Sequence, residues 1–259
     1  MYFLSDVYYV CWREMKRFLS QKTRILMTVF QPLVWLVLMG NMMDGLTSNS
    51  MAAGMLGIDN YLSFMTPGIM IMTTLFGGVF GGVSIIWDRR TGFLNKMLAA
   101  PIARAAIPLG KMIAIAIQSI FQIAVIAVIA ALFGVKFVTG MAGILFMLVI
   151  IILFSCGMAG ISLSLATVIK SHETLMAVVN FLTLPLMFTS ATIFPKLAMP
   201  SWLKVIATWN PLTYAVEPIR TLTVHGWVWP RILPGLALML LFAAVMIAVS
   251  TRQFSKSIA

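Results

Sequence analysis

Residues of the types that carry out catalysis or bind metals are few in this chain, and none has the spacing of a known catalytic group. The 259 residues include 2 histidines and 7 acidic residues. His172-Glu173 begins like the zinc-protease motif HExxH, in which a second histidine four residues after the first completes the metal site. In this chain that position holds Met176. We therefore predict no catalytic constellation, no metal site and no cofactor bound by the chain itself.

A phosphate-binding loop is also missing from the sequence. The pattern GxxxxGK[ST] cradles phosphates with backbone amides and a lysine. Gly110-Lys111 is the most similar stretch, but Met112 follows it and Ala105 stands where the first glycine belongs. We predict that the chain does not hydrolyse ATP in the P-loop manner. Acidic carriers for a proton or sodium relay are nearly absent from the apolar runs, so energy for uphill transport would enter through another subunit.

The composition determines which elements can position any functional group. The chain is 61% hydrophobic and 10% charged, with a mean hydropathy of +1.01, whereas soluble domains are about half apolar and about a quarter charged. Six apolar runs reach the ~20 residues that a helix needs to cross a bilayer. We predict an all-α integral membrane protein with one domain over residues 1–259. Its predicted spans are about 25–43, 61–87, 112–133, 141–169, 174–193 and 232–250.

Basic residues outnumber acidic ones by 18 to 7, and their distribution predicts a topology. Most of them lie in the N-terminal segment, in residues 88–111, in the turn at 170–173 and in the C-terminal tail. Lys and Arg concentrate in cytoplasmic loops, so both termini are predicted on the cytoplasmic side of the cell membrane. The positive charge is attributed to this multi-pass topology and not to binding of nucleic acid.

Residues 3–20 precede the first apolar run and carry apolar side chains at helical spacing, with a basic cluster on the other side. This pattern predicts a helix that lies in the membrane surface and contacts lipid. Whether it only anchors the first span or also contacts a partner is left open. The residues assigned to this interfacial helix are Trp12, Arg13, Lys16 and Arg17.

The predicted spans contain several unusual residues. The second run is longer than the hydrocarbon requires, and we predict a break at Pro67-Gly68. Its interleaved glycine pairs would allow close helix packing, either within one subunit or across a dimer. Polar side chains in the third and fifth runs would either bond between helices or line a transport path. The glycines are Gly77, Gly78, Gly81 and Gly82, and the polar residues are Gln118, Gln122 and Asn180.

Residues 194–231 form the longest segment outside the spans. They contain two short helical stretches, about 201–208 and 212–223, and charged residues keep either from crossing the bilayer. We predict re-entrant helices that dip into the outer leaflet before the last span. An acidic and a basic residue three positions apart in the second stretch could pair. The residues assigned to this outer segment are Asn210, Pro211, Tyr214, Glu217 and Arg220.

Residues 88–111 form a polar segment between two apolar runs. After Gly92 the apolar side chains recur on one face of a short helix, and Pro101 ends it because the residue before a proline disfavours helical geometry. The resulting amphipathic helix at 92–100 would either rest on lipid headgroups or dock into the groove of a partner.

Three stretches, in order along the chain, resemble the membrane subunits of type-2 ABC transporters. These are permeases of the daunorubicin-resistance, nodulation-factor and polysaccharide-export kind. The stretches are FMTPGIMIMTTLFGGVFGGVSIIWD at 64–88, WDRRTGFLNKMLAAPIARAAIPLGK at 87–111 and WNPLTYAVEPIR at 209–220.

The resemblance implies a half-transporter. Two copies of such a subunit pair, and each docks its loop helix, the coupling helix, onto a separate ATP-binding subunit that holds ATP and Mg. It also implies outward transport of an amphipathic drug, lipid or lipid-linked glycan. The alternative is a secondary carrier or channel that works without ATP. The residues expected to couple to the ATPase are Arg90, Gly92, Phe93, Leu94, Lys96, Met97, Leu98, Pro101 and Arg104.

Overall fold

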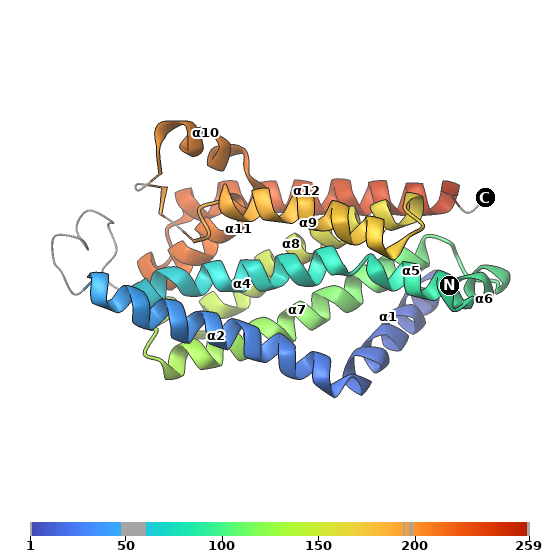
Figure 1. The fold of residues 1–259 in the computed structure, drawn as a ribbon, viewed down its shortest axis with the longest axis horizontal. Coiled ribbons are helices and arrows are strands. Elements are labelled where there is room, and N and C mark those ends of the chain that lie inside the picture. Colours follow the sequence, from blue (N-terminus) through green and yellow to red (C-terminus); the bar gives the residue numbers. More distant parts are fainter. Residues whose placement is uncertain (1, 48–60, 194, 197–198, 258–259) are drawn as a thin grey trace.

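The computed structural model describes residues 2–47, 61–193, 195–196 and 199–257, and the regular elements in these ranges are all helical. Long helices lie side by side along the long axis of the molecule, and short helices lie at its two ends (Figure 1). In chain order the elements are α1 (Tyr2–Ser20), α2 (Lys22–Thr47), α4 (Tyr61–Phe80), α5 (Val83–Arg90), α6 (Phe93–Ala99), α7 (Ala106–Leu132), α8 (Gly140–Val168), α9 (His172–Phe188), α10 (Ser201–Trp209), α11 (Pro211–Arg220), the π-helix η2 (Thr221–His225) and α12 (Trp229–Ser257).

Helix α8 is the centre of the bundle and packs against α4, α7 and α12. Its Ile150, Ile151 and Phe154 are fully buried. Glycines on α8 let α12 approach closely, because a Cβ on Gly160 would lie 2.8 Å from the Cβ of Met246. The small residues of α8 therefore determine how tightly the last helix packs.

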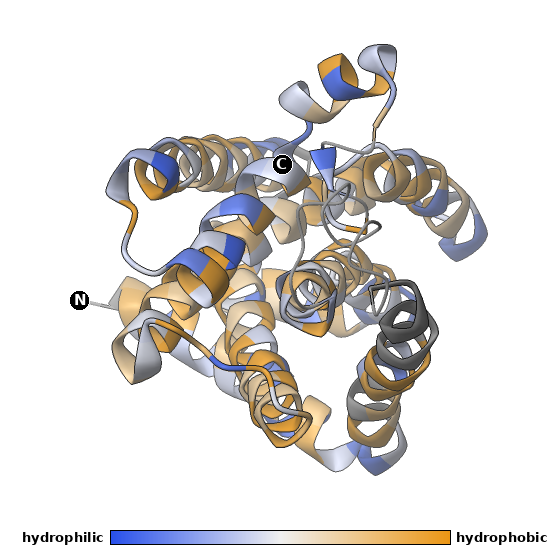
Figure 2. Cartoon of the chain, turned by 90° about the vertical axis from the view of Figure 1, so that its left-hand side faces the viewer, coloured by the Kyte–Doolittle hydropathy of each residue, from blue (hydrophilic) through white to orange (hydrophobic). Residues whose placement is uncertain are grey.

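Four stretches of helix are long and apolar enough to cross a membrane: Tyr61–Arg90, α7, α8 and the stretch Trp229–Lys256 of α12. Hydrophobic residues make up most of the long helices (Figure 2). Many of their large apolar side chains are exposed, such as Leu132, Phe181 and Leu241, as expected for surfaces in contact with lipid. Among the described residues, two shorter apolar helices correspond to the remaining predicted spans, Ile25–Leu38 within α2 and the whole of α9. The chain is thus a multi-pass membrane protein.

The predicted break at Pro67-Gly68 is wrong. Helix α4 continues through Pro67, and the interruption falls fourteen residues later, at Gly81-Gly82. The hydroxyl of Ser162 on α8 accepts a hydrogen bond of 2.9 Å from the Gly82 amide and donates one to the Val79 carbonyl. The break occurs there because a neighbouring helix supplies partners for the backbone groups that the turn frees.

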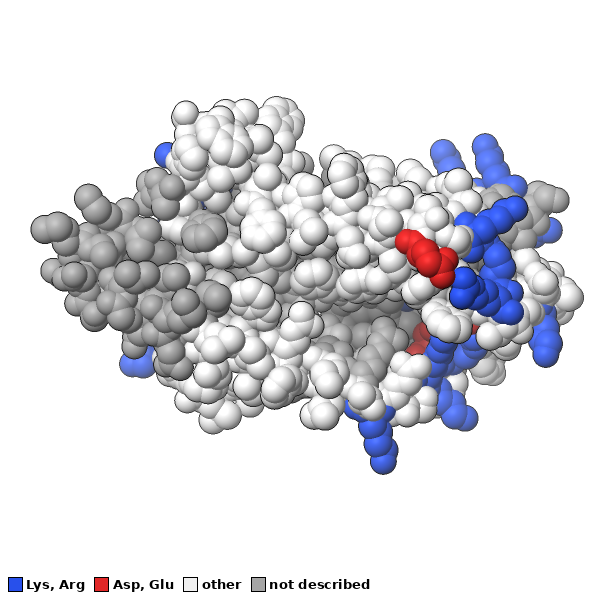
Figure 3. Space-filling model, viewed as in Figure 1, with Lys and Arg blue, Asp and Glu red and all other residues white. Residues whose placement is uncertain are grey.

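The two ends of the bundle differ in charge and in the elements that they carry. Helix α6, the start of α1 and the end of α12 lie at one end, and α10 and α11 lie toward the other (Figure 1). On the face drawn in Figure 3, Lys and Arg side chains gather at the end that carries α6. The short helices predicted at 201–208 and 212–223 correspond to α10 and to α11 with η2.

Candidate functional site

Helix α6 is bounded by two local backbone features. Gly92, immediately before it, has φ +68°, a left-handed conformation that glycine adopts without strain. At the other end Ala100 is extended, as expected for a residue before Pro101. The predicted helix at 92–100 therefore forms at Phe93–Ala99, held as a short rigid element between α5 and α7.

The apolar stripe of α6 faces the interior of this chain and does not form a free docking surface. Leu94 and Met97 are only 3% and 5% exposed and belong to the main hydrophobic core. The fold of this chain therefore covers the face of α6 that carries Leu94 and Met97. The role of the α6 residues in coupling stays a prediction. The coupling residues that stay exposed at this end are Arg90, Lys96, Pro101 and Arg104, together with Asn95.

A buried ionic cluster lies directly behind α6, where α1, α5 and α7 meet. Its centre is the ammonium group of Lys111 on α7, which is 1% exposed. The Lys111 Nζ lies 2.6 Å from Asp88 Oδ2, 2.7 Å from Glu14 Oε1 and 3.0 Å from the hydroxyl of Ser84. Buried charges persist in a fold when they are paired and hydrogen-bonded, and these three contacts satisfy all three donors of the ammonium.

Arg13 on α1 joins this cluster to α6. Its guanidinium donates to both carboxylate oxygens of Asp88, at 2.6 and 3.2 Å, and to Glu14 at 3.1 Å. Its central carbon lies 3.7 Å from the ring centroid of Phe93, in cation–π geometry. Burial acts to lower the pKa of Arg13, but the hydrogen bond to Asp88 and the charges of both carboxylates raise it above its ordinary value. The arginine thus stays charged.

Further contacts fasten α1 to the same end of the bundle. The backbone amide of Ala103, just after α6, donates to the Asp6 carboxylate at 3.1 Å. Arg17 lies 3.7 Å from Asp88, whereas Trp12 and Lys16 point outward and are exposed. The predicted interfacial helix therefore has two faces, one built into the cluster and one free.

Sequence reasoning did not include Glu14, Asp88 and Lys111 among the site residues. A signal was present, because Asp88 and Lys111 stand at the margins of long apolar runs and Glu14 is one of the few acidic residues of the chain. Buried charges require opposite partners, so these residues were candidates for pairing. Lys111 is 97 residues from Glu14 and 23 residues from Asp88 in the sequence, and no local pattern pairs residues over such separations.

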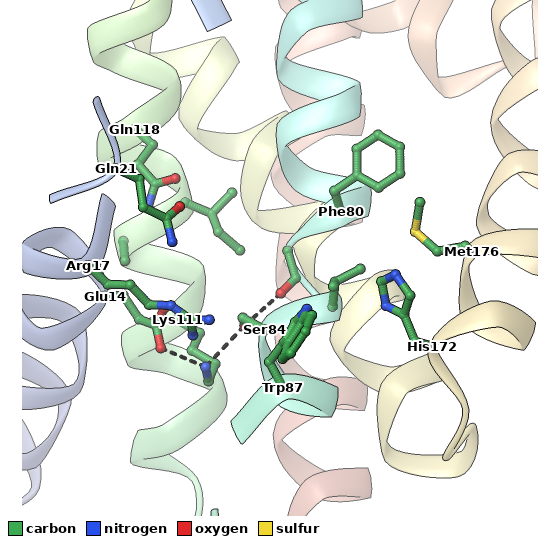
Figure 4. Close-up of a pocket in the computed structure, with 14 residues that line it drawn as sticks. Glu14, Arg17, Gln21, Phe80, Ser84, Trp87, Lys111, Gln118, His172 and Met176 are labelled. Atoms are coloured by element: carbon green, nitrogen blue, oxygen red, sulfur yellow. Dashed lines mark hydrogen bonds and ion pairs between the residues drawn. The ribbon is translucent and has the colours of Figure 1, made fainter. Parts of the chain in front are cut away.

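A cavity of about 580 Å³ opens beside the ionic cluster. Arg17, Gln21, Lys111 and Gln118 lie on one side of it, and Trp87 and His172 lie toward the other (Figure 4). Its wall therefore combines cationic and amide groups with an aromatic ring.

A second cavity, of about 540 Å³, lies farther along the bundle and is mostly apolar. The two cavities share Phe80, Ile115 and Gln118 in their walls, so they adjoin each other. Gln122 lines the second cavity, is 8% exposed, and its carbonyl oxygen has no hydrogen-bond partner among the described residues. Together the cavities form one elongated hollow with a polar end and an apolar end.

The polar residues of the third and fifth runs lie in different surroundings. Gln118 lines both cavities and Gln122 lines the second, whereas Asn180 on α9 is exposed and lines neither. That they line a transport path stays a prediction. Gly77 also lines the second cavity, and a Cβ there would have its nearest neighbour at 3.7 Å.

The other three glycines of the second run are packed within this subunit. A Cβ on Gly78 would lie 2.7 Å from the Cβ of Met158 on α8, and one on Gly82 would overlap the Ser162 backbone. Gly81 faces Ile115 on α7 in the same way. These glycines allow close contact between helices of one chain.

At the opposite end, Asn210 organises the outer segment. Its side-chain oxygen caps α11 by accepting from the Leu212 amide at 2.9 Å, and its amide nitrogen donates to the Leu186 carbonyl at 2.7 Å. Pro211 follows as the first residue of α11, a position that proline favours. Tyr214 lies one turn later and is half-buried.

The expected ion pair between Glu217 and Arg220 is replaced by other contacts. The Glu217 carboxylate lies 2.6 Å from Lys196. Arg220 donates to the carbonyls of Phe64, Ala191 and Thr192 and stacks 3.6 Å from the Phe64 ring centroid. Glu217 and Arg220 thus take partners from segments that are distant in the sequence and adjacent in the fold.

The fold and the site define a helical membrane protein with a short helix anchored at its basic end. Comparison with known families agrees: residues 5–224 match the family described as ABC-2 type transporter. The chain belongs to this family, so it is a membrane permease of an ABC transporter.

Individual relatives include proteins named as permeases. The chain is 31% identical to a transport permease of Cyanophora paradoxa named ycf38, over 87% of this chain and 76% of that protein. It is 23% identical to nodulation protein J of Azorhizobium caulinodans, over 88% and 87% of the two chains. It is 22% identical to a protein of Escherichia coli K12 named as a multidrug ABC transporter permease, YbhR, over 61% of this chain and 43% of that one.

Proposed function

We propose that the chain is the membrane subunit of an ATP-driven exporter, and that it moves an amphipathic substrate outward with energy from a separate ATP-binding subunit. The observation that carries the proposal is the buried cluster around Lys111. It connects the element that would receive the force, α6, to the helices that line the cavities.

The cluster is suited to transmit motion. Asp88 lies two residues before the end of α5, Lys111 lies in the second turn of α7, and Arg13 contacts both Asp88 and Phe93 of α6. A displacement of α6 would therefore move α1, α5 and α7 together, because separating buried charges from their partners costs several kcal/mol. Of these helices, α7 forms walls of both cavities.

Docking to the ATPase is proposed through the exposed side of α6. Asn95 and Lys96 point away from the core, while Leu94 and Met97 hold the helix on the bundle. The apolar stripe serves as the anchor and the polar side as the contact. ATP and Mg would be held entirely by the partner.

An amphipathic substrate is supported by the two adjoining cavities. The end near Arg17 and Gln21 offers charged and amide groups, and the end near Trp35 and Phe76 is apolar. A molecule with a polar head and an apolar body would match both ends.

The proposed topology has six spans, with α6 and both termini in the cytoplasm of the cell and α10 and α11 at the outer leaflet. The gathering of Lys and Arg at the α6 end supports it (Figure 3). Two copies would form the complete transporter, each bound to one ATP-binding subunit.

The test uses the permease and its ATP-binding subunit reconstituted together in lipid vesicles. Lys96→Glu reverses an exposed charge on α6 and should abolish stimulation of the ATPase by the permease. Lys170→Glu is the matched control, because Lys170 is also exposed and lies in the turn between α8 and α9. This control should keep stimulation near that of the unmodified protein.

Two results would contradict the proposal. One is normal stimulation and transport by the Lys96→Glu protein, which would remove the coupling role of α6. The other is transport by the purified permease alone without nucleotide, which would favour a secondary carrier or channel.

A further inference from the structure

A third cavity, of about 520 Å³, lies at the end of the bundle opposite α6. Helix α11, the π-helix η2, the first turns of α12 and the residues Ala191, Pro195 and Lys196 contribute to its walls. It is separate from the two cavities that make up the proposed transport path, and it shares no lining residue with them.

The wall of this cavity carries more cationic than anionic side chains. Lys196, Arg220 and Arg231 line it, and Glu217 is the only acidic residue among the described residues of its wall. Glu217 is paired with Lys196 at 2.6 Å. Arg220 is held by backbone carbonyls, and Arg231 is exposed and forms no ion pair with the residues that the structure describes. Within the described part of the chain, Arg220 and Arg231 therefore have no carboxylate bound to them, and an anion would complete the site.

The start of α12 adds to this positive character. Pro230, Arg231 and Pro234 all line the cavity and belong to the first two turns of α12. The N-terminus of a helix carries a partial positive charge, which favours a phosphate nearby.

The surrounding side chains indicate the depth of the cavity in a bilayer. Trp227 and Trp229 flank it in sequence, stack with ring centroids 5.5 Å apart and are 41% and 46% exposed. Tryptophan concentrates at the level of lipid headgroups. On α12, Leu238 and Leu241 follow Pro234 at helical spacing and are exposed, so an apolar surface runs from the cavity toward the middle of the bundle.

We propose that this cavity binds the phosphate of an anionic phospholipid headgroup, with Arg231 and Arg220 as its cationic partners and the acyl chains along the Leu238–Leu241 surface of α12. With the topology proposed above, the lipid belongs to the outer leaflet. The site is distinct from the substrate path and does not depend on ATP.

The experiment measures lipid binding to the purified full chain in detergent by native mass spectrometry. The probes are dioctanoyl phosphatidylglycerol, dioctanoyl phosphatidylcholine and inorganic phosphate. Arg231→Gln removes the free cation and should leave the fold intact, because Arg231 is exposed. Lys204→Gln is the matched control, since Lys204 is an exposed cation on α10 that lies outside the cavity.

We expect phosphatidylglycerol to bind more tightly than phosphatidylcholine. Its affinity should fall by about tenfold in Arg231→Gln, the loss typical of one charge-assisted hydrogen bond, and stay unchanged in Lys204→Gln. Equal losses in the two variants, or equal binding of the two lipids, would overturn the proposal. Inorganic phosphate binding as tightly as phosphatidylglycerol would overturn the lipid as occupant. No ATPase or transport is measured, so failure here is distinguishable from failure of the exporter proposal.

Discussion

Replacing Lys111 by Met tests whether the buried cluster holds the α6 end of the bundle together. The methionine keeps an unbranched apolar stem of similar length but removes the ammonium group. That group makes three contacts, at 2.6 Å to Asp88, 2.7 Å to Glu14 and 3.0 Å to Ser84. Two buried carboxylates then lose the cation that they share.

The expected loss of stability follows from what each carboxylate keeps. Removing one partner of a buried ion pair typically costs about 3–5 kcal/mol. Asp88 keeps two hydrogen bonds from Arg13, at 2.6 and 3.2 Å, and Glu14 keeps one at 3.1 Å. The lower end of the range is therefore appropriate, about 3 kcal/mol, or about 150-fold in the folding constant.

The assay is unfolding of the purified chain by sodium dodecyl sulfate in dodecyl maltoside micelles, followed by far-ultraviolet circular dichroism. Lys136→Met is the matched control, because Lys136 is exposed in the turn after α7 and its loss should change the free energy of unfolding by less than about 0.5 kcal/mol. The double variant Lys111→Met with Asp88→Asn removes opposite charges together. Its loss should be smaller than the sum of the two single losses, because neither charge is then left unpaired.

Two outcomes would refute this reasoning. If Lys111→Met unfolds at the same detergent concentration as the unmodified chain, the cluster does not stabilise the fold. If the losses of the single variants add in the double variant, the two charges do not act as a pair.

Three further predictions concern single contacts. Gly77→Leu should fill the apolar cavity, so it should leave stability nearly unchanged and lower substrate-stimulated ATPase activity in vesicles. Gly78→Leu should destabilise the fold, because its Cβ would meet α8 at 2.7 Å. Similar stability of the two proteins would contradict this prediction. Ser162→Ala should lower the free energy of unfolding by about 1–3 kcal/mol, since it leaves the Gly82 amide and the Val79 carbonyl without the hydroxyl as partner. An unchanged unfolding curve would show that the turn between α4 and α5 is stable without the hydroxyl. Burial and a nearby carboxylate raise the pKa of Cys11, so less thiolate is present at a given pH. Maleimide should therefore label Cys11 at least about tenfold more slowly at pH 8 than it labels a cysteine at the exposed position in Lys16→Cys. Equal labelling rates would contradict the burial of Cys11.

Local sequence features predicted the ends of several elements correctly. Gly92 and Pro101 bound α6 because one permits a left-handed residue and the other forces its predecessor to be extended. Asn210-Pro211 begins α11 because its side chain caps the helix and proline favours the first helical position. These effects act within a few residues, so they can be read without knowing the fold.

Contacts between distant segments could not be predicted in this way. The sequence pattern of α6 predicted an apolar face at Leu94 and Met97, but it did not predict which surface covers that face. In the structure, other residues of the same chain cover it. The same holds for the glycines: Gly78 meets α8 while its neighbour Gly77 faces a cavity. Periodicity assigns a residue to a side of a helix, and only the packing of other helices determines what lies on that side.

The sequence by itself determined that this is a helical membrane protein without a nucleotide-binding loop, because hydropathy and motif spacing are properties of contiguous residues. The tertiary structure alone decided where α4 breaks, which partners Glu217 and Arg220 take, and that Lys111 joins Glu14 and Asp88. The physical reason is that buried polar groups must find partners, and in this fold the partners come from helices far apart in the chain.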